Sequence, residues 1–213
     1  MTDRPALTRE RIVAAAVAVA DEGGLTAASM RNVGKQLGVE AMSLYHHVAS
    51  KSALLDALAD WIFAQIELPE PGTPWRPAMQ ARAASARSVL AAHPWALGLI
   101  ESRPDPGPAL LTHHNAVLGC LRGNGFTVAL ALQAFSAIDS YVYGFVLTEL
   151  NLPFQTFQGA WDVAISMDPP AAEYPHLTEV MSTVVSGAYT YTAEFDNGLE
   201  LILDGLERRL AEA

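Results

Sequence analysis

A tyrosine and two adjacent histidines, residue types suited to binding metals or moving protons, stand together in residues 37–48, which read LGVEAMSLYHHV. On a helix, the side chains of Tyr45, His46 and His47 diverge by about 100° per residue. Adjacent histidines therefore do not readily share a metal ion. Helical metal pairs lie four residues apart, as in H-E-x-x-H, a pattern that this sequence lacks. His113 and His114 are also adjacent and are equally unsuited to sharing a metal ion. We interpret the trio of Tyr45, His46 and His47 as a contact surface.

The segments around this trio have the dimensions of a helix-turn-helix. Helical periodicity predicts a first helix over residues 7–23, a second over 30–37 and a third over 41–47. Ser29 is placed to cap the second helix, and Gly38 permits the sharp turn before the third. In such a motif the second of the two joined helices enters the DNA major groove with its N-terminal residues toward the base edges.

In this docking arrangement the side chains would make different kinds of contact with DNA. Met42 can contact a thymine methyl group, and Ser43 can reach a donor or an acceptor on a base, with Ala41 beside them. Arg31 can pair with guanine or hold phosphate. The polar tips of Tyr45 and His46 suit phosphate oxygens, which fix the register without reading sequence. We expect His47 to pack back toward the next helix; the alternative is that both histidines are ordinary surface residues.

A fourth helix is expected from its cap, Ser50, to about residue 67, with Leu54, Leu58, Trp61 and Ile62 facing inward. Lys51 lies at its N-terminus, where a cation opposes the helix dipole at a cost of a few tenths of a kcal/mol. A DNA phosphate bound at that terminus would make the position of Lys51 favourable instead of costly. The alternative is a solvated Lys51.

The charge of the chain is unevenly distributed. The net charge is −10, which alone argues against a nucleic-acid partner. However, residues 1–51 carry six basic and five acidic side chains, including both lysines, whereas residues 52–213 carry seven and eighteen. Such asymmetry is a weak indication of a nucleic-acid-facing end. Cys120 is the only cysteine, which excludes an intrachain disulfide and predicts a small buried side chain.

The run LPEPGTP, residues 68–74, cannot continue a helix and marks the expected domain boundary. We therefore predict an all-α fold with a DNA-binding domain over residues 1–50, a linking helix over about 50–67, and an effector-binding and dimerisation domain over 75–213. Helices are expected over residues 76–92, 95–102, 108–123, 127–151, 175–188 and 193–211, and a loop with a helical turn over 153–174.

Residues 128–147 are long and apolar enough to span a bilayer. Asp139 near their middle makes that costly, so a buried or interface helix is the better interpretation. Nothing at the N-terminus has the pattern of a secretion signal, which predicts a cytoplasmic protein. Small residues on this helix and an apolar stripe on the last helix could form a four-helix dimer interface: Ser136, Ser140 and Gly144 on the first, and Leu199, Ile202, Leu203, Leu206 and Leu210 on the second.

Residues 7–62 resemble the DNA-binding domain of the TetR family of bacterial repressors. The resemblance rests on LTRERIVAAAVAVADEGG and SMRNVGKQLGVEAMSLYHHVASKSALLDALA, in which LGVE..SLY.HV..K.ALLDAL is the specific pattern. It implies a homodimeric, all-α transcription regulator with its recognition helix at residues 41–46. The family's base and phosphate contacts would fall on Arg31, Ala41, Met42, Ser43, Tyr45, His46 and Lys51.

The segments ESRPDPGPALL, LRGNGFTVALALQAFSAIDSYVYGFVL and EFDNGLELILDGLERRL are similar to the C-terminal domain of the tetracycline repressor subgroup. This implies a domain that binds a small inducer and forms the dimer. In that subgroup a histidine four residues before the RP pair helps to hold the magnesium ion of the drug chelate. Leu99 occupies that position here, so the resemblance implies a different inducer, with no metal and no cofactor.

Family position and helical phase give the candidate pocket residues. Arg82 stands out, because a charge facing an apolar cavity needs a partner and could hold an acidic ligand. The alternatives are an exposed arginine or one paired with an acidic neighbour. The full set of candidates is Trp61, Arg82, Ala86, Trp95, Ser102, His114, Asn115, Ile138 and Tyr141.

These observations predict a repressor that a small-molecule inducer releases from an inverted-repeat operator. An enzyme is the first alternative, but the sequence has no H-E-x-x-H, G-x-S-x-G, Walker loop or dinucleotide-binding fingerprint. The second is a ligand- or protein-binding helical module without DNA regulation, against which Arg31, Tyr45 and Lys51 argue.

Overall fold

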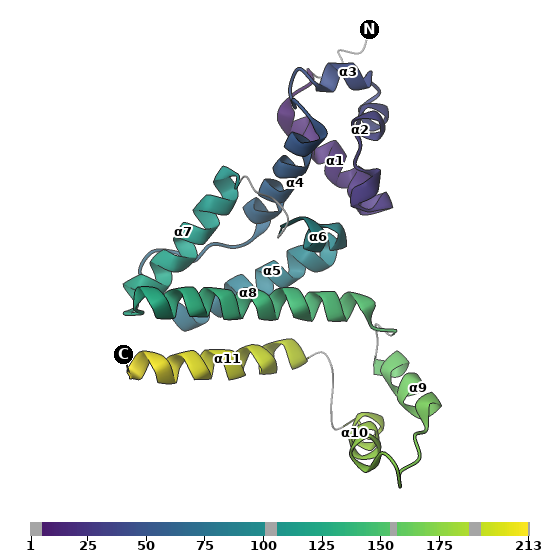
Figure 1. Ribbon diagram of the computed structural model, residues 1–213, viewed down its shortest axis with the longest axis vertical. Helices are drawn as coiled ribbons and strands as arrows, with labels where there is room; N and C mark the ends of the chain where they lie inside the picture. The colour runs from purple at the N-terminus through teal and green to yellow at the C-terminus, as the bar shows by residue number, and fades with distance from the viewer. Residues whose placement is uncertain (1–5, 101–105, 154–156, 188–192, 213) are drawn as a thin grey trace. The chain divides into compact units, whose positions relative to one another are not determined.

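The computed structural model describes residues 6–100, 106–153, 157–187 and 193–212. Helices and turns make up these residues, with no β-strand among them (Figure 1). The all-α class is therefore confirmed. The chain divides into two compact units, Met1–Tyr143 and Gly144–Ala213, and each is described by itself.

The first unit begins with three helices, α1 (Arg9–Gly23), α2 (Met30–Leu37) and α3 (Ala41–Leu44), which lie together at the N-terminal end (Figure 1). Thr8 and Ser29 cap α1 and α2, as their sequences predict. The third helix is shorter than the expected 41–47. Beyond α3 the backbone continues in tight turns, because the N–H of residue 47 bonds to the carbonyl three residues before it.

Two glycines set the geometry between α2 and α3. Gly38 has a φ of 66°, in the left-handed region that glycine adopts at little cost. Gly34 lies so close to the following turn that an added Cβ would stand 2.9 Å from the Val39 carbonyl oxygen and 3.3 Å from the Ala41 Cα. The two helices therefore pack closely, and α3 is held by backbone contact as well as by side chains.

Helix α4 (Lys51–Gln65) connects these helices with the rest of the unit. The Ser50 hydroxyl accepts a hydrogen bond from the Ala53 N–H at 3.0 Å, which confirms the predicted cap. Leu54, Leu58 and Ile62 are fully buried and form the core-facing stripe of α4. Trp61, expected to face inward with them, lies beside this stripe and is half-buried, with its ring against that of His93.

The remainder of the first unit is helical as well. Helix α4 packs along α7, and α5 packs against both. Trp75 and Phe126 meet edge to face, with ring centroids 5.0 Å apart, where α5 begins and α7 has ended. The elements are α5 (Trp75–Ala92), the 3₁₀ turn η2 (Pro94–Ala96), α6 (Leu97–Ile100), α7 (Pro108–Gly123) and the first part of α8 (Val128–Asn151).

Within the described ranges, α8 is the one helix long and apolar enough to cross a membrane by length and composition. Asp139, near its middle, is buried and forms an ion pair with Arg82 of α5. A carboxylate paired inside the protein favours a helix of the interior or of a subunit interface over a membrane span. Ser136 and Ser140 are exposed on it.

The second unit contains the end of α8 together with α9 (Phe157–Met167), α10 (Pro175–Val185) and α11 (Glu194–Ala211). Helix α9 corrects the loop expected over residues 153–174. The prolines of that stretch flank the helix instead of interrupting it, so nothing prevents helical hydrogen bonding between them. Helix α9 packs against α10, and Phe145 meets Phe195 edge to face at 5.1 Å.

Candidate functional site

The tip of α3 presents an unusual surface. Met42 is 72% exposed and Tyr45 is 43% exposed, although both are large and largely apolar. Leu44 and Val48, between and after them, are buried and anchor this segment to the core. Because Leu44 and Val48 hold this segment against the core, the apolar side chain of Met42 and the phenol of Tyr45 remain at the surface, where they can contact a partner.

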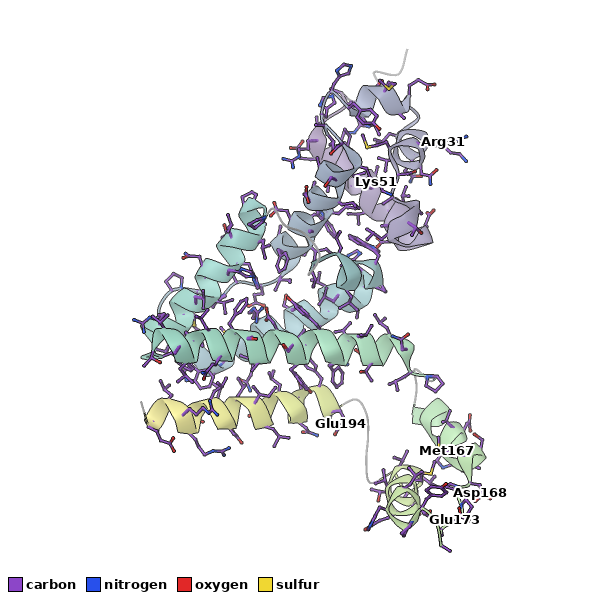
Figure 2. All side chains as sticks on the ribbon, in the orientation of Figure 1. Arg31, Lys51, Met167, Asp168, Glu173 and Glu194 are labelled. Atoms are coloured by element: carbon purple, nitrogen blue, oxygen red, sulfur yellow. The ribbon has the colours of Figure 1, made fainter. Side chains whose placement is uncertain are left out.

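Basic and polar side chains surround this tip. Arg31, His46 and Lys51 are exposed, and Figure 2 shows Arg31 projecting from α2. Ala41 and Ser43 are half-buried at the start of α3. All seven predicted DNA-contacting residues thus lie on or beside one short helix-turn-helix.

One expectation in this region is wrong. His47 is exposed and does not pack toward α4, because the helix ends at Leu44 and the direction extrapolated from a longer helix does not apply. Val48 fills the core position instead.

A second cluster lies in the core, around Arg82 of α5. Arg82 is 2% exposed, and its Nη2 forms an ion pair with Asp139 of α8. Its Nε–H donates a hydrogen bond to Nε2 of His113 on α7, at 3.1 Å. The Arg82 Nη1 and the His113 Nδ1 are buried and have no hydrogen-bond partner. The acidic neighbour considered from the sequence is therefore the partner of Arg82, yet part of the guanidinium is left unsatisfied.

Burial sets the protonation of the histidines here. It lowers the pKa of His113 to about 3, with the positive charge of Arg82 and then His114 acting in the same direction. Burial also lowers the pKa of His114, which Asp139 partly offsets. Both imidazoles are neutral at physiological pH, so Arg82 and Asp139 carry the charges of the cluster and cancel one another.

Two phenylalanine rings lie against this cluster. The ring of Phe63, on α4, lies 5.3 Å from that of His113 and 6.1 Å from that of His114, measured between centroids. Phe135 on α8 meets His114 edge to face at 4.8 Å, and the Arg82 guanidinium carbon lies 5.6 Å from the Phe135 centroid. Four helices, α4, α5, α7 and α8, thus each contribute a side chain to one group of contacts.

The two tryptophans predicted for the pocket belong to a different group. The Trp95 Nε1–H donates to Asp21 Oδ1 at 2.6 Å, and the His93 Nδ1 lies 2.7 Å from the same oxygen. Trp61 contacts the His93 ring edge to face at 5.1 Å. This group joins the end of α1 to η2 and α4.

The other candidates vary in position. Ala86 and Ile138 are buried, Tyr141 is half-buried, and Asn115 is exposed. Ser102 lies outside the described residues. Leu99, at the position of the magnesium-binding histidine in the tetracycline repressors, is 1% exposed.

A carboxylate joins α4 to α7. Asp60 Oδ1 accepts hydrogen bonds from the Ala109 N–H at 2.7 Å and the Leu110 N–H at 3.2 Å, so a residue of α4 caps the first turn of α7. An added Cβ at Gly107 would overlap this carboxylate. Beside it lies a cleft of about 280 Å³, lined by Phe63, Ala64, Ile66, Leu68, Pro108, Ala109 and Thr112.

Sequence reasoning did not assign roles to His113, Asp139, Asp60 or Asp21. One of them, Asp139, had a usable signal. Arg82 is a charge on the apolar face of its helix, and Asp139 is an acidic residue in the middle of an apolar helix, so a pairing of the two could have been inferred. Nothing local marks Asp60 as the cap of a helix that begins 48 positions later. Within the described residues no group of three or more His, Cys, Asp or Glu side chains could hold a metal ion.

Comparison with known proteins gives a family match for each of the two parts of the chain. Residues 12–58 match the family described as "Bacterial regulatory proteins, tetR family", and residues 68–210 match "Tetracyclin repressor-like, C-terminal domain". An HTH-type transcriptional regulator of Saccharopolyspora erythraea is 35% identical over 95% of this chain and 86% of its own length. The HTH-type transcriptional repressor DrrR1 of Streptomyces coeruleorubidus is 34% identical over 98% of this chain and 80% of its own.

The fold agrees with a solved relative. Apo ActR from Streptomyces coelicolor is 27% identical, with a TM-score of 0.81 over 99% of each chain, and ActR has also been solved in complex with actinorhodin. The chain belongs to the TetR family of bacterial regulators. It is a helix-turn-helix transcriptional regulator.

Proposed function

We propose that this regulator is a repressor that binds an inverted-repeat operator as a homodimer and leaves it when a small-molecule inducer binds. The observation that carries the DNA contact is the 72% exposure of Met42 at the tip of a capped helix-turn-helix. Arg31, Ala41, Met42, Ser43, Tyr45, His46 and Lys51 form the proposed contact surface. Met42 and Ser43 read bases, while Tyr45 and Lys51 hold phosphates.

We propose that the chain has three parts with different roles. Residues 1–50 bind DNA, residues 50–67 link, and residues 75–213 bind the effector and form the dimer. The two matched family ranges, which meet between residues 58 and 68, support this division. The protein acts in the cytoplasm, without cofactor and without catalysis, since its relatives are transcriptional regulators.

The dimer contact is proposed on α8. Within the first unit, Val128 and Leu132 are 62% and 54% exposed, and Ser136 and Ser140 continue the same stripe at four-residue spacing. Two apolar and two small side chains on one helical face allow a second helix to approach closely. The sequence motif for a four-helix interface includes the same serines of α8. The apolar stripe of α11 that it also includes is less suited to a dimer contact, because Leu199, Leu203 and Leu206 are already buried within the subunit.

The inducer is proposed to bind in the second domain. Actinorhodin bound to ActR supports a small organic molecule, and Leu99 argues against magnesium–tetracycline. Coupling to DNA would run through α4, because this helix begins at Lys51 and is fastened to α7 through Asp60. A ligand that favours a displaced α4 would lower DNA affinity.

The test is a gel-shift selection from genomic fragments of the source organism, followed by sequencing of the retained DNA. The expected result is a small set of DNA fragments that share an inverted repeat. A fraction of a cell extract should release these fragments from the protein. Retention of no fragment even at low salt, where phosphate contacts are strongest, would instead favour a binding module without DNA regulation.

A further inference from the structure

We propose that Met42 is a modification site, at which oxidation of the thioether by a peroxide lowers the affinity of the regulator for its operator. The inference rests on the proposed function, in which Met42 contacts DNA bases, and it adds a form of regulation to that same surface. Three observations carry it: the exposure of this side chain, the rigid backbone beneath it, and the burial of the other described sulfur atoms of the first unit.

The sulfur atoms of the first unit are unequally accessible. Met42 is 72% exposed, whereas Met30 and Met79 are 6% and 0% exposed. Cys120 is buried as well, and burial raises the pKa of its thiol, which keeps the thiol in its less reactive protonated form. Among the described residues of this unit, an oxidant in solution therefore reaches the sulfur of Met42 first.

The backbone around Met42 prevents this side chain from withdrawing into the core. On one side of it Leu44 is fully buried, and on the other side Gly34 packs so closely that an added Cβ would lie 3.3 Å from the Ala41 Cα. The side chains of Ala41 and Ser43, its neighbours in sequence, are too short to cover a thioether. The fold of the helix-turn-helix therefore holds the sulfur at the surface of the free protein.

The reaction transfers one oxygen atom and two electrons. A lone pair of the Met42 sulfur attacks one oxygen of hydrogen peroxide, the O–O bond breaks, and an S–O bond forms. The departing hydroxide takes up the proton of the transferred oxygen, so the products are methionine sulfoxide and water. Sulfur loses two electrons and peroxide gains them. A methionine sulfoxide reductase reverses the change, with a dithiol oxidised to a disulfide and water released.

Oxidation changes the polarity of the DNA contact. The thioether is apolar and suits a thymine methyl group in the major groove. The sulfoxide is strongly polar, and against a methyl group it would lose its bound water without gaining a hydrogen bond. The affinity for the operator should therefore fall about tenfold or more, the penalty expected for burying one unpaired polar group.

DNA binding in turn controls access to the sulfur. A side chain that lies between the recognition helix and the base edges is covered by the DNA, so peroxide reaches Met42 only in the released protein. Oxidation then keeps the regulator off its operator until a reductase restores the thioether. The modification would thus prolong the released state.

The first experiment compares the two exposed methionines in one sample. Full-length protein is treated with hydrogen peroxide, with and without a saturating amount of a DNA fragment retained in the gel-shift selection, and peptide mass spectrometry follows each sulfoxide. Met42 should oxidise several-fold more slowly with the fragment. Met167, which is 55% exposed at the end of α9 and outside the helix-turn-helix (Figure 2), should oxidise at the same rate in both samples. Equal rates at Met42 would overturn the proposal.

The second experiment measures operator affinity before and after peroxide, and the readout is the ratio of the two values within each protein. The wild type should lose about tenfold or more and regain its affinity after treatment with methionine sulfoxide reductase and dithiothreitol. Met42→Leu, which keeps an apolar side chain of similar volume without sulfur, should give equal values. Met167→Leu is the matched control and should lose as much as the wild type.

A further variant tests the polarity argument without an oxidant. Met42→Gln has an unbranched polar side chain of similar length, and it should bind the operator more weakly than Met42→Leu. Equal affinities of these two variants would contradict the expected cost of a polar group at this position.

The outcomes separate this proposal from the proposed function. Unchanged affinity of a wild type whose Met42 is fully oxidised overturns the modification site, as does a loss that persists in Met42→Leu or that the reductase does not restore. Each of these results leaves the repressor intact, because the untreated protein still binds its operator. Failure of the untreated wild type to bind any fragment would overturn the proposed function, and this inference with it.

Discussion

At the scale of single residues, His113 makes stability depend on pH. The unfolded imidazole binds a proton below its ordinary pKa of 6.5, whereas the folded one does so only near 3. Between these values the unfolded state holds more protons, so stability falls as the pH is lowered through this window. Between pH 7 and pH 5 we expect a loss of about 2 kcal/mol from this group, with His114 acting in the same direction.

Urea unfolding at pH 7 and pH 5 measures this loss. The control is His113→Leu, which lowers stability at both pH values but should show a smaller difference between them. An unchanged difference in the variant would mean that His113 is not the titrating group.

Lys51 gives a second prediction at this scale. Lys51→Ala should weaken operator and non-specific binding alike and reduce the slope of log affinity against log salt by about one unit per contacting subunit. Lys35→Ala, which removes the same charge from the exposed end of α2, is the matched control and should have a smaller effect. If both variants behave alike, net charge and not a phosphate on the α4 N-terminus accounts for the effect.

Residue-level prediction from sequence succeeded where the relevant chemistry is local. Thr8, Ser29 and Ser50 each bond to an N–H three positions later, so the caps can be read from neighbouring residues. The pairing of Arg82 with Asp139 spans 57 positions and depends on how α5 and α8 pack. Helical periodicity indicates that Arg82 and Asp139 each face inward. It does not indicate which helix faces pack against one another.

At the scale of elements, the cap that Asp60 provides for α7 predicts a stability effect. Asp60→Ala removes the acceptor of two N–H groups and should lower the free energy of unfolding by about 1 kcal/mol. Asp60→Asn keeps an acceptor oxygen in the same place and should lose less. Chemical denaturation of the three proteins measures the order, and equal stability of Asp60→Ala and the wild type would exclude the cap as a stabilising contact.

Element boundaries were predictable where a proline, glycine or cap stands at the end. Helix α7 was expected over 108–123 and is found there, with Pro108 at its first position. The sequence does not reveal α9, because prolines on either side of it are equally typical of a loop. The sequence also makes α3 longer than it is, since the pattern of apolar residues does not distinguish a helix from the tight turns that follow Leu44.

At the scale of the whole molecule, a two-fold dimer predicts the form of the operator. Two recognition helices should contact half-sites about one helical turn, roughly 34–36 Å, apart in an inverted repeat. Ser136→Arg would put a charge in the proposed α8 stripe and should weaken both dimerisation and operator binding while preserving helix content. Ser88→Arg, an exposed site on α5, is the control. A footprint on an isolated half-site, unchanged by protein concentration, would contradict the dimer.

The Arg82–Asp139 pair also limits the routes by which this protein can evolve. Replacing either member alone strands a buried charge, at a cost of about 3–5 kcal/mol, a large share of the stability of a typical domain. Two simultaneous replacements are rare, so the pair is inherited as a unit through successive generations. Changes at Phe63 and Phe135 can proceed in single steps, because their rings adjoin the cluster without holding a charge. Descendants of this protein would therefore diversify first in the apolar surroundings of the pair, and only later in the pair itself.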